Sequence, residues 1–204
     1  MIKNIKYIPI GSDYQFETLA WTFDFDFDFD IMSEINSKDC HRTSIDSMLP
    51  IPDRYSYDYS ESTKLADFLQ EWQYSIISIL ENIFYENETL KIFKSRWPIK
   101  KENFSNAVYP HTAIFQDPPG FNMGPHLDNQ SVIANVIINL KDNDYGTSFH
   151  NYKQHNEILY RASGKANTGV IFLNTPGSLH SVCNELDSDR YILYSSILIK
   201  AGWY

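Results

Sequence analysis

The first half of the chain carries a long helical pattern. Over residues 62–86, apolar side chains recur at intervals of three and four, which places them along one face of an α-helix. Ser60 or Ser62 can cap its first turn. A shorter helix is predicted over residues 88–96, because Pro98 cannot continue it. The apolar face indicates core packing rather than a cofactor site.

The second half has the pattern of short strands. Five segments are rich in Val, Ile, Phe and Tyr, and turn-forming residues separate them. They span residues 107–116, 132–140, 146–150, 169–173 and 191–199. Helices followed by strands predict an α+β, mainly β fold, in which an antiparallel sandwich or barrel carries a helical buttress. Because no linker or repeat interrupts the chain, we expect a single domain over 1–204, with support in 1–105 and the core in 106–204.

Residues 23–30 read FDFDFDFD, a strict alternation. A period of two places the phenylalanines on one face of a strand and the aspartates on the other. A calcium loop is the alternative, since alternating aspartates imitate the start of an EF-hand. Phe29 stands where that loop needs glycine, however, and Ile35 where it needs glutamate. We therefore predict a strand flanking the core, with its phenylalanines inward and with charges that discourage edge pairing.

The segment between this repeat and the long helix is irregular. Residues 33–60 contain Pro50, Pro52, scattered polar residues and the aromatic stretch YSYDY. This pattern predicts a long loop with short extended pieces. Since loops often carry specificity, we expect it to contribute to the rim of a pocket.

Composition places the chain among compact acidic proteins. The 204 residues are 43% hydrophobic and 15% aromatic, which suffices for a core without disulfides or zinc. The net charge of −9 argues against nucleic acid and against an anionic membrane surface. No apolar run could span a membrane, and the N-terminus lacks the apolar core of a signal peptide. With Cys40 and Cys183 expected as reduced thiols, we predict a cytoplasmic protein.

The residues that can carry chemistry lie in the strand-rich half. Phosphate-binding glycine loops, a GxSxG elbow, CxxC pairs and HExxH are absent from the sequence. What remains is an ordered set. His126 and Asp128 stand in the tripeptide HLD, His180 follows His126 by 54 residues, and Arg190 follows ten residues later.

This set of residues could hold a metal ion and, beside it, a bound molecule that has a carboxylate group. On a strand, residues i and i+2 project to the same side, so His126 and Asp128 converge. His180 from a distant strand completes a two-histidine, one-carboxylate face, which leaves positions open on a non-haem Fe(II) ion, whereas zinc favours a closed tetrahedral shell. The Arg190 guanidinium can form two parallel hydrogen bonds with the carboxylate of a ligand. His150 is a rival third ligand, but it follows His126 too closely to leave room for the intervening strands.

The ordered set and its flanks resemble the Fe(II)- and 2-oxoglutarate-dependent dioxygenase superfamily, and the prolyl-hydroxylase-like branch most of all. Residues 118–126 are similar to the turn that leads into the family's first ligand. Residues 146–149 and 169–173 are similar to two of its strands. The resemblance covers about residues 107–199. It implies a double-stranded β-helix, or jelly-roll, core with supporting N-terminal helices.

The resemblance also implies an activity. His126, Asp128 and His180 would hold Fe(II), and Arg190 would pair with the distal carboxylate of the cosubstrate 2-oxoglutarate. The protein would be an oxidoreductase, a hydroxylase that uses O2 and releases succinate and CO2. Its substrate would be a peptidyl proline or a small amino-acid-like metabolite, since the acidic charge points away from nucleic-acid substrates.

The sequence departs from the family pattern near Arg190. Ile192 stands where the family commonly has serine, so a helper hydroxyl has to come from elsewhere. Asn135 and Asn139 share a parity on one predicted strand and are candidates for cosubstrate binding if they face the interior; a half-solvated face is the alternative. Asp117 stands where some relatives have a tyrosine that touches the cosubstrate.

Two further functions stay open at this point. The jelly roll could be a non-catalytic binding or structural module, which the isoleucine at position 192 favours. A cupin-like metal enzyme without 2-oxoglutarate would use the same three ligands but would have no use for Arg190.

Overall fold

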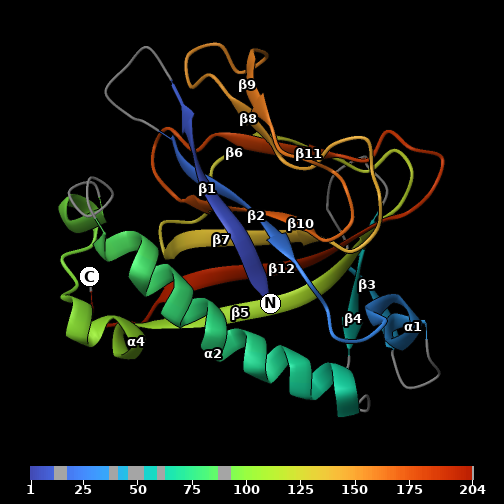
Figure 1. Cartoon of the computed structure of the whole chain (residues 1–204). Helices are drawn as coiled ribbons and strands as arrows, with labels where there is room; N and C mark the ends of the chain where they lie inside the picture. Colours follow the sequence, from blue (N-terminus) through green and yellow to red (C-terminus); the bar gives the residue numbers. More distant parts are fainter. Residues whose placement is uncertain (12–17, 37–40, 46–52, 59–62, 87–92, 204) are drawn as a thin grey trace.

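The computed structural model describes residues 1–11, 18–36, 41–45, 53–58, 63–86 and 93–203. Its strands form two antiparallel sheets (Figure 1). The larger sheet has eight strands in the order β1-β2-β10-β7-β12-β5-β4-β3, and the smaller has four in the order β6-β11-β8-β9. The strands are β1 (Ile2–Ile10), β2 (Thr18–Phe25), β3 (His41–Ile45), β4 (Arg54–Asp58), β5 (Val108–Asp117), β6 (Asn122–His126), β7 (Val132–Asn139), β8 (Ser148–His150), β9 (Ile158–Arg161), β10 (Thr168–Leu173), β11 (His180–Cys183) and β12 (Arg190–Ile199).

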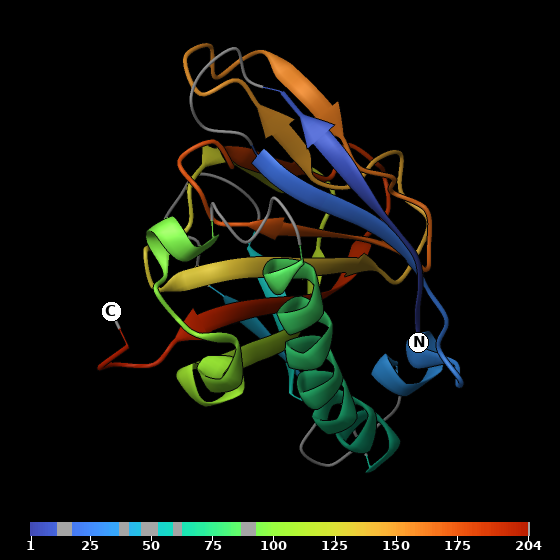
Figure 2. The ribbon, with the colours of Figure 1, turned by 60° about the vertical axis from the view of Figure 1, so that its left-hand side comes forward.

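Strands β5 to β12 form a jelly roll, as predicted. Strands β10-β7-β12-β5 of the larger sheet face β6-β11-β8-β9 of the smaller one (Figures 1 and 2). Apolar side chains from both sheets fill the space between them, including Phe149, Phe172 and Ile192. Every residue of β7 is buried, because this central strand is covered on both faces.

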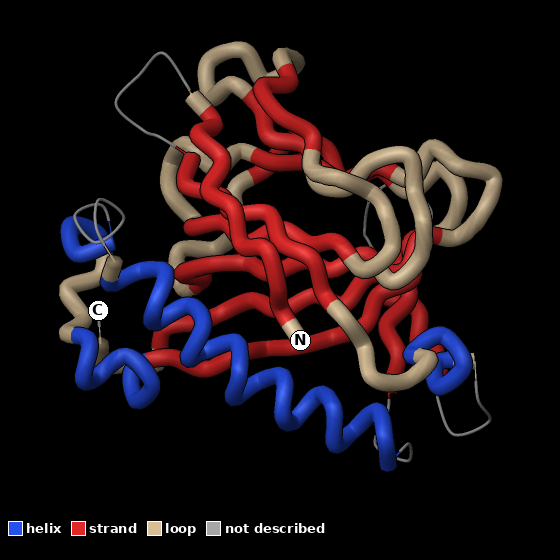
Figure 3. Tube along the Cα trace, viewed as in Figure 1, coloured by secondary structure: helices blue, strands red, loops and turns tan. Residues whose placement is uncertain are grey.

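Helix α2 (Thr63–Tyr85) covers the opposite face of the larger sheet (Figures 1 and 3). Its buried residues repeat with the helical period and pack into the main core: Leu65, Leu69, Trp72, Ile76, Leu80 and Phe84. The Trp72 indole Nε1 also donates to the Ser195 hydroxyl on β12 over 2.8 Å, which fixes the helix on the sheet. The predicted long helix is confirmed, while its candidate caps Ser60 and Ser62 lie outside the described residues.

A short helical segment connects this helix to the jelly roll. The described end of the second predicted helix, residues 93–96, stops before Pro98 as expected. A 3-10 turn (Lys101–Asn103) and helix α4 (Phe104–Ala107) then lead into β5. Among the described residues, no helix is long and apolar enough to cross a membrane.

The FDFDFDFD repeat is a strand only in its first half. Strand β2 ends at Phe25, yet the alternation continues through residue 30, with the aspartates exposed and the phenylalanines buried or half-buried. The inward orientation of the phenylalanines is therefore confirmed. The aspartates do not protect a free strand edge, as their charges were expected to do, because β2 pairs with β1 on one side and with β10 on the other.

The described parts of residues 33–60, which are 33–36, 41–45 and 53–58, are more regular than the predicted long loop. Helix α1 (Ile31–Ile35) follows directly on the repeat, and the Asp30 carboxylate accepts from the Ser33 backbone N–H as its N-cap. Strands β3 and β4 pair with each other, and β4 extends the larger sheet beside β5. Alternating aromatic residues in β4 fit this strand position.

The five strands predicted in the second half are all present, as β5, β7, β8, β10 and β12. Strand β8 begins at Ser148 rather than at residue 146. The hydrophobic pattern did not reveal β1, β6, β9 or β11, although the metal-ligand motif placed His126 and His180 on strands. Strands β6, β9 and β11 have only five, four and four residues, too few to reveal an alternation, and β1 is mostly exposed.

Candidate metal centre

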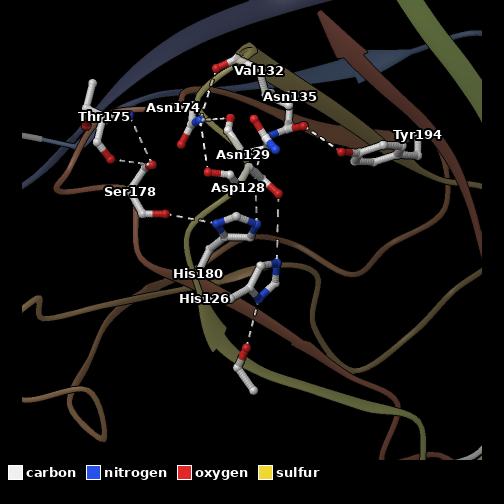
Figure 4. Close-up of polar contacts among 11 residues, drawn as sticks. His126, Asp128, Asn129, Val132, Asn135, Asn174, Thr175, Ser178, His180 and Tyr194 are labelled. Atoms are coloured by element: carbon white, nitrogen blue, oxygen red, sulfur yellow. Dashed lines mark hydrogen bonds and ion pairs between the residues drawn. The ribbon is translucent and has the colours of Figure 1, made fainter. Parts of the chain in front are cut away.

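The three predicted metal ligands meet at the smaller sheet (Figure 4). His126 is the last residue of β6, His180 is the first residue of β11, and the two are paired in register on neighbouring strands. Asp128 lies two residues beyond the end of β6, in a loop, so the predicted sharing of one strand is wrong. The pairing of two strands, together with this loop, brings the three side chains to one point.

The geometry of these side chains fits a divalent metal ion. Their ligand atoms all lie within 4.8 Å of one another. The Asp128 carboxylate is 3.5 Å from Nε2 of His180 and 3.9 Å from Nε2 of His126. Two imidazoles and one carboxylate on one side leave the other octahedral positions open for further ligands, as in non-haem Fe(II) sites.

Both histidines are held in the tautomer that a metal requires. Nδ1 of His126 lies 2.8 Å from the Gly124 carbonyl, and Nδ1 of His180 lies 2.9 Å from the Ser178 carbonyl. Because a carbonyl only accepts, each Nδ1 carries the proton and each Nε2 keeps its lone pair for a metal. Burial lowers the pKa of His180 to about 4, against the opposing attraction of Asp128, so this ring is neutral at pH 7.

A hydrogen-bonded chain holds the Asp128 carboxylate (Figure 4). Asn135 on β7 donates from Nδ2 to Oδ2 of Asp128 over 2.6 Å, and the Tyr194 hydroxyl on β12 donates to Oδ1 of Asn135 over 2.7 Å. Burial raises the pKa of Tyr194, which keeps the hydroxyl protonated and able to donate. Asn135 therefore faces the interior, as one of its two interpretations required, and its contact is with the carboxylate ligand.

The backbone around the ligands is also pinned. Nδ2 of Asn174 donates to the carbonyls of Asn129 and Val132 over 2.9 and 3.0 Å, which closes the loop that carries Asp128. On the way to His180, the Ser178 hydroxyl donates to the Thr175 carbonyl over 2.8 Å. The ligand positions are thus set by buried amide and hydroxyl groups that no sequence motif identifies.

Arg190 lies at the start of β12, where its guanidinium is buried against a carboxylate. Its Nη1 donates to Oδ2 of Asp117 over 2.8 Å, and β12 and β5 place the two residues directly opposite each other. Arg54 on β4 binds the same carboxylate through Nε and Nη2, over 2.6 and 3.1 Å. Burial lowers the pKa of Arg190, while Asp117 opposes this shift. A motif of the second half predicted Arg190, but neither Arg54 nor the pairing with Asp117 was predicted.

The remaining candidates have other surroundings. Nδ2 of Asn139 donates to the Ser163 carbonyl over 2.9 Å, and its Oδ1 has no partner among the described residues, so its role in cosubstrate binding stays a prediction. Ile192 is buried in the interior cluster, where it supplies an apolar contact in place of a hydroxyl. His150 lies 2.7 Å from the Ser181 hydroxyl through Nε2 and does not join the candidate metal site.

We compared the chain with known protein sequences and solved structures. Neither a protein-family model nor a curated protein sequence matches the chain. Among solved structures, a putative oxygenase from Shewanella oneidensis is 15% identical, with a TM-score of 0.51 over 81% of this chain and 64% of that one. An oxidoreductase of the 2OG-Fe(II) oxygenase family from Burkholderia pseudomallei is 12% identical, with a TM-score of 0.49 over 82% of this chain and 76% of that one.

A viral collagen prolyl hydroxylase from Paramecium bursaria Chlorella virus-1 is also similar. It is 12% identical, with a TM-score of 0.43 over 81% of this chain and 98% of that one. At such low identities the similarity concerns the fold alone, and we base the comparison of folds on the Shewanella structure, whose TM-score is 0.51. The chain therefore has a jelly-roll fold similar to that of the Shewanella structure, which agrees with the fold implied by the resemblance found in the sequence.

Proposed function

We propose that this protein is an Fe(II)- and 2-oxoglutarate-dependent hydroxylase. The observation that carries the proposal is the meeting of His126, Asp128 and His180 within 4.8 Å, in the correct tautomers, inside a jelly roll that also buries Arg190. Two segments that lie 54 residues apart in the sequence bring these three ligands together.

The residues of the chain have distinct parts in this function. His126 and His180 would bind the metal through Nε2, and Asp128 would supply the one anionic ligand. When bound, Fe(II) supplies the redox chemistry that couples decarboxylation of a 2-oxo acid to hydroxylation of a C–H bond. Asn135 holds the carboxylate in place. The Phe172 ring lies 4.7 Å from the His180 ring and gives this ligand an apolar neighbour.

The proposed substrate is a peptidyl proline or a small amino-acid-like metabolite. The prolyl-hydroxylase-like motifs of the sequence support this class, and the acidic charge disfavours nucleic acid. Proline-containing peptides and free amino acids should therefore be offered separately, and the gain of one oxygen atom should be measured by mass spectrometry. A hydroxylated product from only one of the two sets identifies the substrate class. If neither set gives a product, both proposed substrate classes are wrong.

A metal enzyme that does not use 2-oxoglutarate is a second candidate. The observation in its favour is that Asp117 already binds the guanidinium of Arg190. Arg190 therefore has one carboxylate partner within the chain, where the first proposal expects the carboxylate of 2-oxoglutarate. The two candidates differ in whether the metal-loaded protein binds 2-oxoglutarate.

The deciding experiment uses protein purified without oxygen and loaded with Fe(II). Addition of 2-oxoglutarate should produce the visible charge-transfer absorption of a 2-oxo acid chelated to Fe(II), and admission of O2 should produce succinate. Asp128→Ala should lose both signals, because the metal loses its anionic ligand. His111→Ala changes an exposed histidine outside the site and should match wild type. Equal succinate from wild type and Asp128→Ala would refute the proposal.

A further inference from the structure

Three charged side chains share one buried site at the end of β5. The Asp117 carboxylate is fully buried and binds two guanidinium groups, Arg54 through two hydrogen bonds and Arg190 through one. The Arg190 side chain is 1% exposed and the Arg54 side chain 14% exposed. Arg54 comes from β4, which lies outside the ordered motif of the second half.

This site has unused hydrogen-bonding capacity. Nε and Nη2 of Arg190 are buried without a partner among the described residues, although a guanidinium has five N–H donors. A buried donor without an acceptor destabilises the protein unless something binds there. A second carboxylate is the acceptor that matches a guanidinium edge best.

The charges of the site lead to the same ligand. Two guanidinium groups against one carboxylate leave one net positive charge, whereas Arg190 and Asp117 alone would be neutral. At the metal centre, a divalent ion with two neutral imidazoles and the Asp128 carboxylate also has one net positive charge. The two centres together balance a ligand with two negative charges, and this balance depends on Arg54.

The two centres face the same interior. The Arg54 guanidinium lies 4.6 Å from the ring centre of Phe115, and Phe115 lies 5.6 Å from the ring of Tyr194. The Tyr194 hydroxyl binds Asn135, which in turn binds Asp128. An unbroken series of contacts therefore runs from the metal carboxylate to the buried guanidinium groups.

We infer that Arg54 determines specificity for a dicarboxylate 2-oxo acid: it supplies the net positive charge that attracts the distal carboxylate, while Asp117 is the buried counter-ion that neutralises one of the two guanidinium groups. This inference rests on the proposed function. From the motif alone, Arg190 would supply the positive charge that attracts the distal carboxylate. In our inference Arg54, on β4, supplies it.

The test is calorimetric binding to protein loaded with Mn(II) instead of Fe(II). The ligands are 2-oxoglutarate and 2-oxopentanoate, which have the same carbon chain with and without the distal carboxylate. Arg54→Gln should weaken 2-oxoglutarate binding by at least about tenfold, because a buried charge partner is lost. Binding of 2-oxopentanoate and of Mn(II) should change by less than about twofold, since neither has a distal carboxylate for Arg54 to attract.

A charge-restoring variant separates this role from a structural one. In the double variant Arg54→Gln with Asp117→Asn, Arg190 regains the net positive charge of the site, and 2-oxoglutarate binding should return to within about threefold of wild type. If Arg54 only supported the fold, the second substitution would bring no recovery. Equal 2-oxoglutarate affinity in Arg54→Gln and wild type, or a double variant no better than the single one, overturns the inference.

Asp117→Asn by itself gives an independent measurement, because it preserves the shape of the side chain. It leaves both guanidinium groups unneutralised, so 2-oxoglutarate should bind at least as tightly as in wild type, with 2-oxopentanoate unchanged. Weaker 2-oxoglutarate binding overturns the inference, even if Arg54→Gln fails to fold. Failure of the proposed function has a different signature, namely that wild type loaded with Mn(II) binds neither 2-oxo acid.

Discussion

Single side chains decide whether the metal centre is preorganised. The two histidines reach their metal-binding tautomer through backbone carbonyls, so their geometry survives most substitutions nearby. Asp128 differs, because it lies in a loop beyond β6 and its orientation depends on Asn135. The carboxylate ligand is therefore the point where the site is most sensitive to its surroundings.

Asn135→Ala should lower the affinity for Mn(II) by about 10–100-fold, the usual effect of removing a partner of a metal ligand. Tyr194→Phe should have a smaller effect in the same direction, since Asn135 still donates to Asp128. Both affinities can be measured by calorimetric titration. Asn151→Ala, at a half-buried asparagine outside the site whose Nδ2 donates to Glu157, is the matched control. Unchanged Mn(II) affinity in Asn135→Ala would mean that the loop alone orients the carboxylate.

The residue types at this centre were readable from the sequence, but their neighbours were not. His126, Asp128, His180 and Arg190 stand at informative spacings along the chain. Arg54 has no motif around it and lies 63 residues from the carboxylate that it binds. The spacing of a motif identifies contacting residues only where the order of the intervening strands is known. The sequence does not reveal where β4 joins the sheet.

At the scale of elements, the aromatic half of the FDFDFDFD repeat joins the sheet to the helix. The Phe25 ring lies 5.2 Å from Trp72 and 6.2 Å from Phe68, both on α2, and 4.6 Å from Phe27. The aspartates on the other face are exposed. The apolar packing of the repeat therefore comes from one face only.

Phe25→Ala should lower the free energy of unfolding by about 3–5 kcal/mol, because a buried ring is lost and the rigid neighbours cannot fill the cavity. Asp28→Asn, at an exposed position of the same repeat, should change it by less than about 0.5 kcal/mol. Urea denaturation followed by fluorescence measures both. A large loss in Asp28→Asn, or none in Phe25→Ala, would contradict this account of the repeat.

Elements with a clear periodicity were predicted, and short ones were not. Helix α2 and strand β7 have long apolar patterns that local sequence determines. Strands β6 and β11, which hold two of the metal ligands, are too short to have such a pattern and exist because each pairs with the other. The elements that build the site are therefore those that the sequence defines least.

At the scale of the whole molecule, the N-terminal half is part of the larger sheet. Strand β2 pairs with β10, and β4 pairs with β5, so the sheet continues through the boundary between the two halves of the sequence. Helix α2 packs on the same sheet from outside. The jelly roll alone would expose both sheet edges and the apolar face under α2.

We expect the chain to unfold in one cooperative transition, as a single domain over 1–204 should. A fragment of residues 106–204 should not fold, because exposed strand edges and an uncovered apolar face favour aggregation. Near-ultraviolet circular dichroism and size-exclusion chromatography of both forms provide the measurement. A monomeric fragment with the fixed aromatic signals of the full chain would contradict this expectation.

The sequence by itself determined the residue types at the metal centre, the long helix and the strands with extended apolar patterns, because these depend on local spacing and periodicity. Only the tertiary structure decided that β1 to β4 extend the larger sheet, that Asp128 binds Asn135, and that Arg54 and Arg190 share Asp117. The physical reason is that strand pairing and buried charge are settled between distant segments. No local pattern records which carboxylate a buried guanidinium will meet.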